Sequence, residues 1–204
     1  MNSTLTRSRR ALAIAIAVVG GVAVVAALVF WRVNGEAAET TTVPYDDAQS
    51  AGLLTLCSAD GKPVTGGNVD DQPFAAVVLG ETALPSNLDP AGAVATLFAY
   101  QPREGVAASE FSGNALTATA EFADPERPAA RVEEDAWTIG DFVTAFPADF
   151  DGYVQLRLYL GTPEAGTLSD QPFDTADLRV DGDAWELVRR GTASCADAES
   201  ALLP

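Results

Sequence analysis

The stretch Tyr153-Val-Gln-Leu-Arg-Leu-Tyr-Leu160 alternates aliphatic side chains with polar or aromatic ones at every position. Because successive side chains of a β-strand point to opposite faces of its sheet, this alternation predicts a strand with one face in the core. The aliphatic residues expected on the inner face are Val154, Leu156, Leu158 and Leu160. The residues expected on the outer face are Tyr153, Gln155, Arg157 and Tyr159.

Further short apolar runs lie on both sides of this stretch and are separated by turns rich in glycine, proline and aspartate. The runs that we expect to form strands are 53–57, 74–79, 94–100, 116–122, 176–180 and 184–188. The last two flank the turn Asp181-Gly-Asp183, which predicts a hairpin. In the run 116–122, alternation is expected to place on one face Leu116, Ala118, Ala120 and Phe122.

One segment has helical rather than strand spacing. Its apolar residues, at positions i, i+3, i+4 and i+7, are Ile139, Phe142, Val143 and Phe146. Thr138 and Asp141 are placed to form a capping box at its first turn. About seven short strands and one short helix predict a mainly β fold, which we interpret as an antiparallel β-sandwich.

The N-terminal segment 11–31 contains neither a charged residue nor a proline. A helix of this length spans roughly 30 Å, the thickness of the hydrocarbon core of a bilayer. Three arginines precede the segment between residues 7 and 10, whereas Arg32 alone follows closely. The positive-inside rule then predicts a single-pass transmembrane helix (a signal anchor) in the cell membrane, with residues 1–10 in the cytoplasm and an extracytoplasmic, extracellular-facing remainder.

Two other interpretations of this segment stay open. The small residues Ala37 and Ala38 offer a cleavage site for a signal peptide, although the apolar run is longer than is usual for one. The pair Arg9 and Arg10 is typical of export by the twin-arginine route, although the residues that follow do not match the usual pattern. All three interpretations export residues 35–204.

The exported part divides into three segments. Residues 32–52 are poor in apolar side chains and show no helical or strand period, which predicts a flexible linker. The extracytoplasmic β-sandwich domain is expected at 53–195, followed by a C-terminal tail at 196–204. Cys57 and Cys195 are the two cysteines of the chain, and in an exported protein we expect them to form a disulfide. On the chain-entropy account, that bridge stabilises the fold by roughly 4–5 kcal/mol.

Charge and composition exclude several classes of function. The chain has a formal net charge of −17, which repels nucleic acids and anionic lipid headgroups, so no nucleic acid is expected as a partner. The lipid bilayer is expected as a partner only through residues 11–31. The absence of histidine excludes Ser-His-Asp triads and histidine-ligated zinc or copper.

The outer face of the stretch 153–160 is the predicted binding surface. Tyr153 and Tyr159 flank the amide of Gln155 and the guanidinium of Arg157. Aromatic rings beside fixed hydrogen-bond donors are suited to binding a sugar or a peptide. The alternative is an ordinary sheet face that the other sheet or a loop covers.

Carboxylates also gather near turns, at 70–71, 149–151 and 181–183. Calcium prefers oxygen ligands of this kind, but the chain has no calcium-loop motif, so we expect no cofactor and keep calcium as an alternative. A glycoside hydrolase would need two such carboxylates about 5–9 Å apart across a cleft.

A resemblance rests on the N-terminal anchor, on Cys57 and Cys195, and on the runs Ala99-Tyr-Gln-Pro-Arg103 and Gly152-Tyr-Val-Gln-Leu-Arg-Leu-Tyr-Leu-Gly161. In these features the chain resembles a class of uncharacterised, single-pass membrane-anchored extracytoplasmic proteins of GC-rich Gram-positive bacteria. The resemblance covers most of residues 53–195. It implies a location at the cell surface and implies no catalytic residues.

These observations predict a non-enzymatic, membrane-anchored binding or accessory domain. Its partner is expected to be another membrane or envelope protein or a cell-wall polymer, because tethering raises the effective concentration of a weak interface. Two alternatives stay open, a carboxylate-dependent hydrolase acting on cell-wall glycans and a purely structural spacer.

Overall fold

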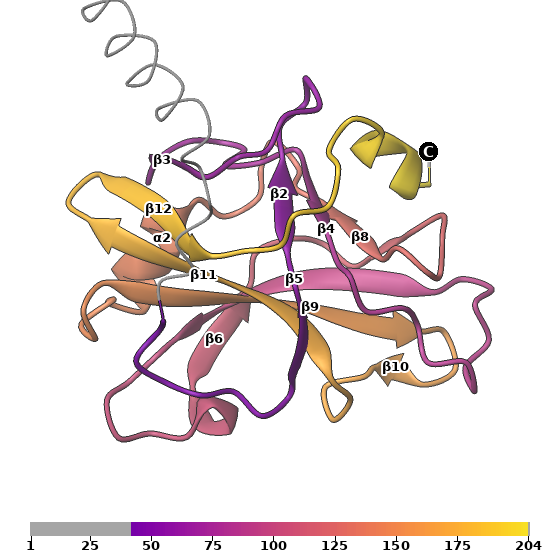
Figure 1. Ribbon diagram of the computed structural model, residues 1–204, viewed down its shortest axis with the longest axis horizontal. Helices are drawn as coiled ribbons and strands as arrows, with labels where there is room; N and C mark the ends of the chain where they lie inside the picture. The colour runs from indigo at the N-terminus through magenta and orange to yellow at the C-terminus, as the bar shows by residue number, and fades with distance from the viewer. Residues whose placement is uncertain (1–41, 204) are drawn as a thin grey trace, which may run out of the picture. The chain divides into compact units, whose positions relative to one another are not determined.

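The strand β9 (Tyr153–Thr162) lies at the centre of a nine-stranded sheet, between β11 (Phe173–Asp181) and β5 (Val94–Gln101) (Figure 1). A computed structural model describes residues 42–203 of the chain. The predicted strand at 153–160 is therefore present and is two residues longer at its end.

The other elements surround this centre. The remaining strands of the large sheet are β1 (Ser50–Leu53), β3 (Gly66–Asn68), β6 (Ser112–Ala115), β7 (Ala120–Glu121), β10 (Gly166–Thr167) and β12 (Ala184–Arg189). A second, three-stranded sheet consists of β2 (Thr55–Cys57), β4 (Val77–Leu79) and β8 (Ala129–Arg131). The helical segments are α2 (Ile139–Ala145) and the short 3-10 turns η1 (Ala108–Glu110) and η2 (Ala198–Ala201).

The pairing confirms the predicted class of fold. Within residues 42–203, β1 and β11 pair in parallel, and the other paired strands are antiparallel. The described chain is thus mainly β, with antiparallel sheets and one α-helix, and its two sheets are consistent with a β-sandwich. The strands are more numerous than the sequence predicted, and β5, β9, β11 and β12 are longer than the predicted runs.

The aliphatic face of β9 lies in the hydrophobic core, as predicted. Val154, Leu156 and Leu158 are almost completely buried. They belong to one apolar cluster with Leu56 and Val78 of the smaller sheet. Burying one leucine contributes about 1.5–3 kcal/mol, so this face adds substantially to the stability of the core.

The predicted hairpin and helix are also confirmed. β11 and β12 pair across a turn in which Gly182 has a φ of +58°, a conformation that glycine adopts without strain. At the start of α2, the Thr138 side chain accepts a hydrogen bond from the Asp141 N–H, and the Asp141 carboxylate accepts one from the Thr138 N–H. This capping box satisfies two backbone donors that the first turn cannot pair.

The predicted strand at 116–122 is wrong. The chain forms β6 before this run and the short β7 within it, and Ala118 is exposed, whereas Leu116 is buried. The reason lies in the pairing with β5, because the N–H of Leu97 donates to the side-chain Oγ1 of Thr117 at 3.1 Å. A side chain here replaces a backbone carbonyl in the ladder, and the regular alternation of the strand is lost.

The predicted linker at 32–52 extends too far. Of its residues the structure describes 42–52, and there Val43 is buried and β1 begins at Ser50. The predicted tail at 196–204 is likewise packed, since Ala201 is completely buried and Leu202 forms a β-bridge with Phe122. In the described residues of these segments, Val43, Ala201 and Leu202 are thus part of the folded domain.

The two cysteines are joined as predicted. The sulfur atoms of Cys57 and Cys195 lie 1.98 Å apart, which is the separation of a disulfide. Cys57 ends β2, and Cys195 belongs to the segment that follows β12. The bridge therefore joins the smaller sheet to the C-terminal segment.

Candidate functional site

The four residues predicted as a binding surface lie together but are covered. Tyr153, Gln155, Arg157 and Tyr159 all project from the face of β9 opposite the apolar cluster, and their exposed fractions are 8%, 0%, 3% and 5%. The prediction that they form an exposed platform is wrong. The alternative, a sheet face covered by another part of the chain, is the one that the structure adopts.

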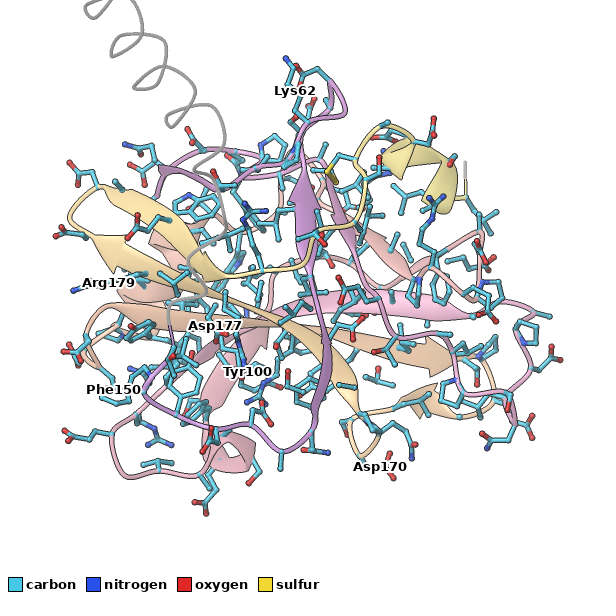
Figure 2. All side chains as sticks on the ribbon, viewed as in Figure 1. Lys62, Tyr100, Phe150, Asp170, Asp177 and Arg179 are labelled. Carbon is cyan, nitrogen blue, oxygen red and sulfur yellow. A yellow bond between two sulfur atoms is a disulfide. The ribbon has the colours of Figure 1, made fainter. Side chains whose placement is uncertain are left out.

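Part of this cover is the segment 43–49, which we call the strap. Its Tyr45 ring packs edge-on against Tyr153, with ring centroids 6.1 Å apart, and against Phe111 at 5.5 Å. The Tyr45 hydroxyl donates a hydrogen bond of 2.5 Å to Oδ1 of Asp177 on β11. Figure 2 shows Asp177 and Tyr100 near the middle of the large sheet and Phe150 toward its left edge. Sequence patterns missed the strap because its contacts come from isolated side chains with no period.

Arg157 is held on all sides beneath the strap. Its guanidinium carbon lies 4.1 Å from the ring centroid of Tyr100 and 4.9 Å from that of Phe173, so aromatic faces flank it. Its Nε donates to Oε1 of Gln155 at 2.7 Å, and its Nη2 donates to the carbonyl of Ala108 in η1 at 2.8 Å. These contacts fix the orientation of the charged group.

A carboxylate of the strap neutralises this arginine. Oδ2 of Asp47 lies 3.0 Å from Nη2 of Arg157, and both side chains are almost fully buried. The two atoms form an ion pair, but they are not aligned for a hydrogen bond, and Oδ2 accepts none from residues 42–203. The other carboxylate oxygen of Asp47, Oδ1, accepts a hydrogen bond of 3.1 Å from the N–H of Gln49, which is also in the strap.

A second buried carboxylate, Asp177, lies next to this pair. Burial raises the pKa of Asp177, and the charge of Arg189 and the hydrogen bond from Tyr45 oppose that rise. Arg189 also forms an ion pair with this carboxylate. Burial likewise raises the pKa of the Tyr45 hydroxyl, with a further contribution from the charge of Asp177. The covered face of the large sheet therefore holds charged groups among aromatic rings.

The carboxylates predicted as possible calcium ligands do not gather into a metal site in the described part of the chain. Within residues 42–203, no three acidic or cysteine side chains lie close enough together to hold a metal ion. Of these carboxylates, Asp71 accepts a hydrogen bond from the Asn68 N–H.

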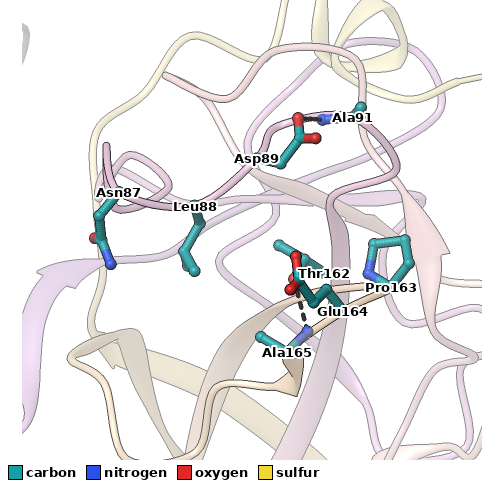
Figure 3. Close-up of a pocket in the computed structure, with 8 residues that line it drawn as sticks. All are labelled: Asn87, Leu88, Asp89, Ala91, Thr162, Pro163, Glu164 and Ala165. Carbon is teal, nitrogen blue, oxygen red and sulfur yellow. Dashed lines mark hydrogen bonds between the residues drawn. The ribbon is translucent and has the colours of Figure 1, made fainter.

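A cleft lies at the opposite end of β9. The loop 87–91 and the turn 162–165 enclose about 410 Å³ that is open to solvent (Figure 3). Gly92, at a φ of +71°, allows the loops to approach, because a β-carbon there would lie 3.0 Å from Cγ of Pro163. Nothing in the sequence alone marked these two loops, which are 70 residues apart, as neighbours.

The cleft has a polar lining with an apolar part. Its acceptors and donors come from Asn87, Asp89, Thr162 and Glu164, and its apolar contacts from Leu88 and Pro163. Asp89 already accepts the N–H of Ala91 with one oxygen, and Thr162 accepts the N–H of Ala165. Carboxylates, an amide and short apolar side chains at a concave surface suit a ligand rich in hydroxyl or amino groups.

The predicted membrane segment 11–31 and cytoplasmic residues 1–10 lie outside the described residues. Within 42–203, no helix is long and apolar enough to cross a membrane. No known protein family, curated protein or solved structure matches the chain. The resemblance inferred from the sequence thus stays a prediction.

Proposed function

We propose that this chain is a non-enzymatic binding module held at the extracytoplasmic face of the cell membrane by residues 11–31. Its binding surface is the cleft between the loop 87–91 and the turn 162–165. Its partner is a wall polymer or an envelope protein that presents hydroxyl or amino groups. The covered face of β9 serves to fix the chain that leads from the anchor.

The observation that carries this proposal is the position of the cleft relative to the start of the domain. Tyr45 of the strap packs against Tyr153 at the start of β9, whereas the cleft is lined by Thr162 at the end of β9. Ten residues of strand at about 3.3 Å each separate the contact of Tyr45 with Tyr153 from Thr162 by roughly 30 Å. The cleft thus lies at the end of β9 opposite to the contact of Tyr45 with Tyr153.

The chemistry of the cleft supports the class of ligand. The side chains of Asp89 and Glu164 are exposed carboxylates on an acidic chain. They favour amines and hydroxyl groups and repel phosphate and other anions. A polymer that offers many weak contacts is bound well by a tethered module, because the effective concentration is high.

One alternative has an observation in its favour. Asp89 and Glu164 line the same cleft, as a carboxylate-dependent glycan hydrolase would require. Such an enzyme also needs one carboxyl group with a raised pKa to act as the acid. A raised pKa of this kind is found at Asp177, which is buried beneath the strap and does not line the cleft.

The experiment is a pull-down of the full-length chain from its own membranes, with the double variant Asp89→Asn/Glu164→Gln. The matched control is Asp149→Asn/Glu134→Gln, which removes the same charge from exposed positions outside the cleft. We expect a partner protein or wall fragment with the unchanged chain and the control, and its loss with the cleft variant. A chain without residues 1–39 tests whether the predicted anchor contributes.

The outcomes separate the three candidates. A partner retained by the cleft variant would rule out the cleft as the binding surface. Release of shortened glycans that depends on Asp89 and Glu164 would establish the hydrolase. If neither partner nor polymer is recovered with any form, the spacer interpretation is favoured.

A further inference from the structure

We propose that Arg157, Gln155 and the rings of Tyr100 and Phe173 form a carboxylate-binding site that Asp47 fills in the free chain. A partner peptide can displace the strap and place its own carboxylate on Arg157. The peptide is extended and carries an aromatic residue two positions before an acidic residue, as the strap does with Tyr45 and Asp47. This site is distinct from the cleft and does not depend on it.

The site is organised without the strap. Arg157 is oriented by Gln155, by the carbonyl of Ala108 and by the rings of Tyr100 and Phe173, and none of these belongs to residues 43–49. All are on β5, β9, β11 or η1. A guanidinium that is fixed in advance loses little freedom when a carboxylate binds, which favours recognition.

Asp47 uses only part of what the site offers. Oδ2 of Asp47 lies near Nη2 but is not aligned for a hydrogen bond. The amide Nε2 of Gln155 is completely buried and likewise makes no hydrogen bond with any residue of 42–203, although it is near enough to Asp177 to affect the pKa of that carboxyl group. Buried donors are rarely left unused in proteins. A carboxylate that is free to adjust its position can align with Nη2 of Arg157, which the strap carboxylate does not do.

The strap is held by few contacts. Between its backbone and the sheet, within residues 42–203, one hydrogen bond is present, from the N–H of Phe173 to the carbonyl of Gln49 at 3.0 Å. The strap is otherwise held by the side chains of Val43, Tyr45 and Asp47, whereas Pro44, Asp46 and Ala48 are exposed. Segments with few backbone hydrogen bonds open locally without unfolding of the domain.

The ligand class follows from the strap itself. A carboxylate must reach Nη2 of Arg157, and an aromatic ring must fill the space between Tyr153 and Phe111 that Tyr45 now occupies. An aromatic hydroxyl that reaches Asp177 adds a hydrogen bond. These three contacts define an extended acidic peptide, and they exclude ligands without an anionic group.

The test uses the full-length chain with Tyr45→Ala/Asp47→Ala and a labelled peptide of residues 42–50. We expect this variant to bind the unchanged peptide about 10-fold more tightly than it binds a peptide carrying Asp47→Asn, because the second peptide lacks the negative charge that pairs with Arg157. The unchanged chain binds the peptide more weakly, because its own strap competes. The control variant Asp46→Ala, altered at an exposed strap position, behaves as the unchanged chain does.

Any one of three results would overturn the proposal. Equal affinity for the two peptides would show that Arg157 does not recognise the carboxylate. An unchanged peptide affinity after adding Arg157→Lys to the double variant would show the same. An unrelated peptide with the same spacing of aromatic and acidic residues must also compete with the labelled peptide for the double variant. If it does not compete, the site binds only the strap of this chain, and a partner site is refuted.

A second measurement does not rely on folding of the variant. In the unchanged chain, hydrogen exchange of the backbone amides of 45–49 is expected at least about 100-fold faster than that of β9, since the strap opens by itself. Exchange of the strap at the rate of β9 would mean that it opens only when the domain unfolds, and the proposal would fail.

Discussion

The two faces of β9 are buried to the same extent by different means. On one face, Leu156 and Leu158 pack against the smaller sheet through contacts that have no preferred direction. On the other, Gln155 and Arg157 are covered by a strap whose partners must be placed atom by atom. Apolar burial tolerates small shifts, whereas a buried charge is costly unless its partner is in position. The apolar face should therefore determine the stability of the domain, and the polar face should determine whether the strap is closed.

The largest expected effect is on the apolar face. Leu156→Ala leaves a cavity in the core and should lower the free energy of unfolding by about 2–5 kcal/mol. Urea unfolding of the domain measures it directly. A loss under about 1 kcal/mol would mean that the core relaxes into the cavity, and the contrast between the two faces would disappear.

A smaller effect is expected from the polar face. Asp47→Ala removes the charge that pairs with Arg157 and should lower the free energy of unfolding by about 1–3 kcal/mol. The loss is smaller than that for a charge left buried without a partner, because the strap is released and water reaches Arg157. The matched change Asp46→Ala, at the exposed neighbour, should stay within about 0.5 kcal/mol. If the two substitutions cost the same, the ion pair with Arg157 does not hold the strap.

The pH dependence of stability should distinguish Asp177 from ordinary carboxylates. Burial raises the pKa of Asp177 above its ordinary value of 3.8, so the folded chain holds this proton more tightly than the unfolded chain. Its contribution to stability is then fully present below pH 3.8 and is lost as the pH rises through the raised pKa. Asp177→Asn should remove this part of the decline.

The measurement is the free energy of unfolding at several pH values above 3.8, for the unchanged chain and for Asp177→Asn. The control Asp181→Asn removes an equal charge at the exposed end of the same strand. The assignment is supported if the free energy of unfolding declines less steeply with pH in Asp177→Asn than in both the unchanged chain and Asp181→Asn. Identical slopes in all three would mean that Arg189 and Tyr45 compensate fully for the burial of Asp177.

The smallest effect on stability is expected at the cleft. Asp89→Asn/Glu164→Gln changes exposed side chains and should alter the free energy of unfolding by less than about 0.5 kcal/mol while abolishing partner binding. Thermal melting combined with the pull-down checks both parts. A large loss of stability would make any loss of binding uninformative about the cleft and would show that its loops are part of the fold.

The same contrast explains what the sequence could predict. Alternation in 153–160 identified the strand and the side chains on each face, because a period of two is a property of the strand itself. Helical spacing with Thr138 and Asp141 identified α2 for the same local reason. Whether the polar face of β9 is open to solvent depends on the strap, which is more than 100 residues away in sequence, and no local pattern encodes that contact.

The cleft and the broken strand illustrate the same limit. The lining of the cleft combines Leu88 and Glu164 from loops that only the folded chain brings together. The run 116–122 alternates well, but the hydroxyl of Thr117 competes for a backbone donor of β5, and that outcome depends on a neighbouring strand. Most single strands and the disulfide pair could therefore be predicted from the sequence, whereas the residues exposed at binding surfaces could not.

The strap has a mechanical consequence for a chain pulled from its N-terminal side. Tension at Thr42 acts first on the contacts of Tyr45 and Asp47, and reaches the backbone ladder of β1 and β11 only after these contacts have parted. Freed and fully extended, the seven residues 43–49 lengthen the connection to at most about 25 Å. A displacement of that size is taken up by extension of the strap, and the β-sheets bear no tension until the strap is fully extended.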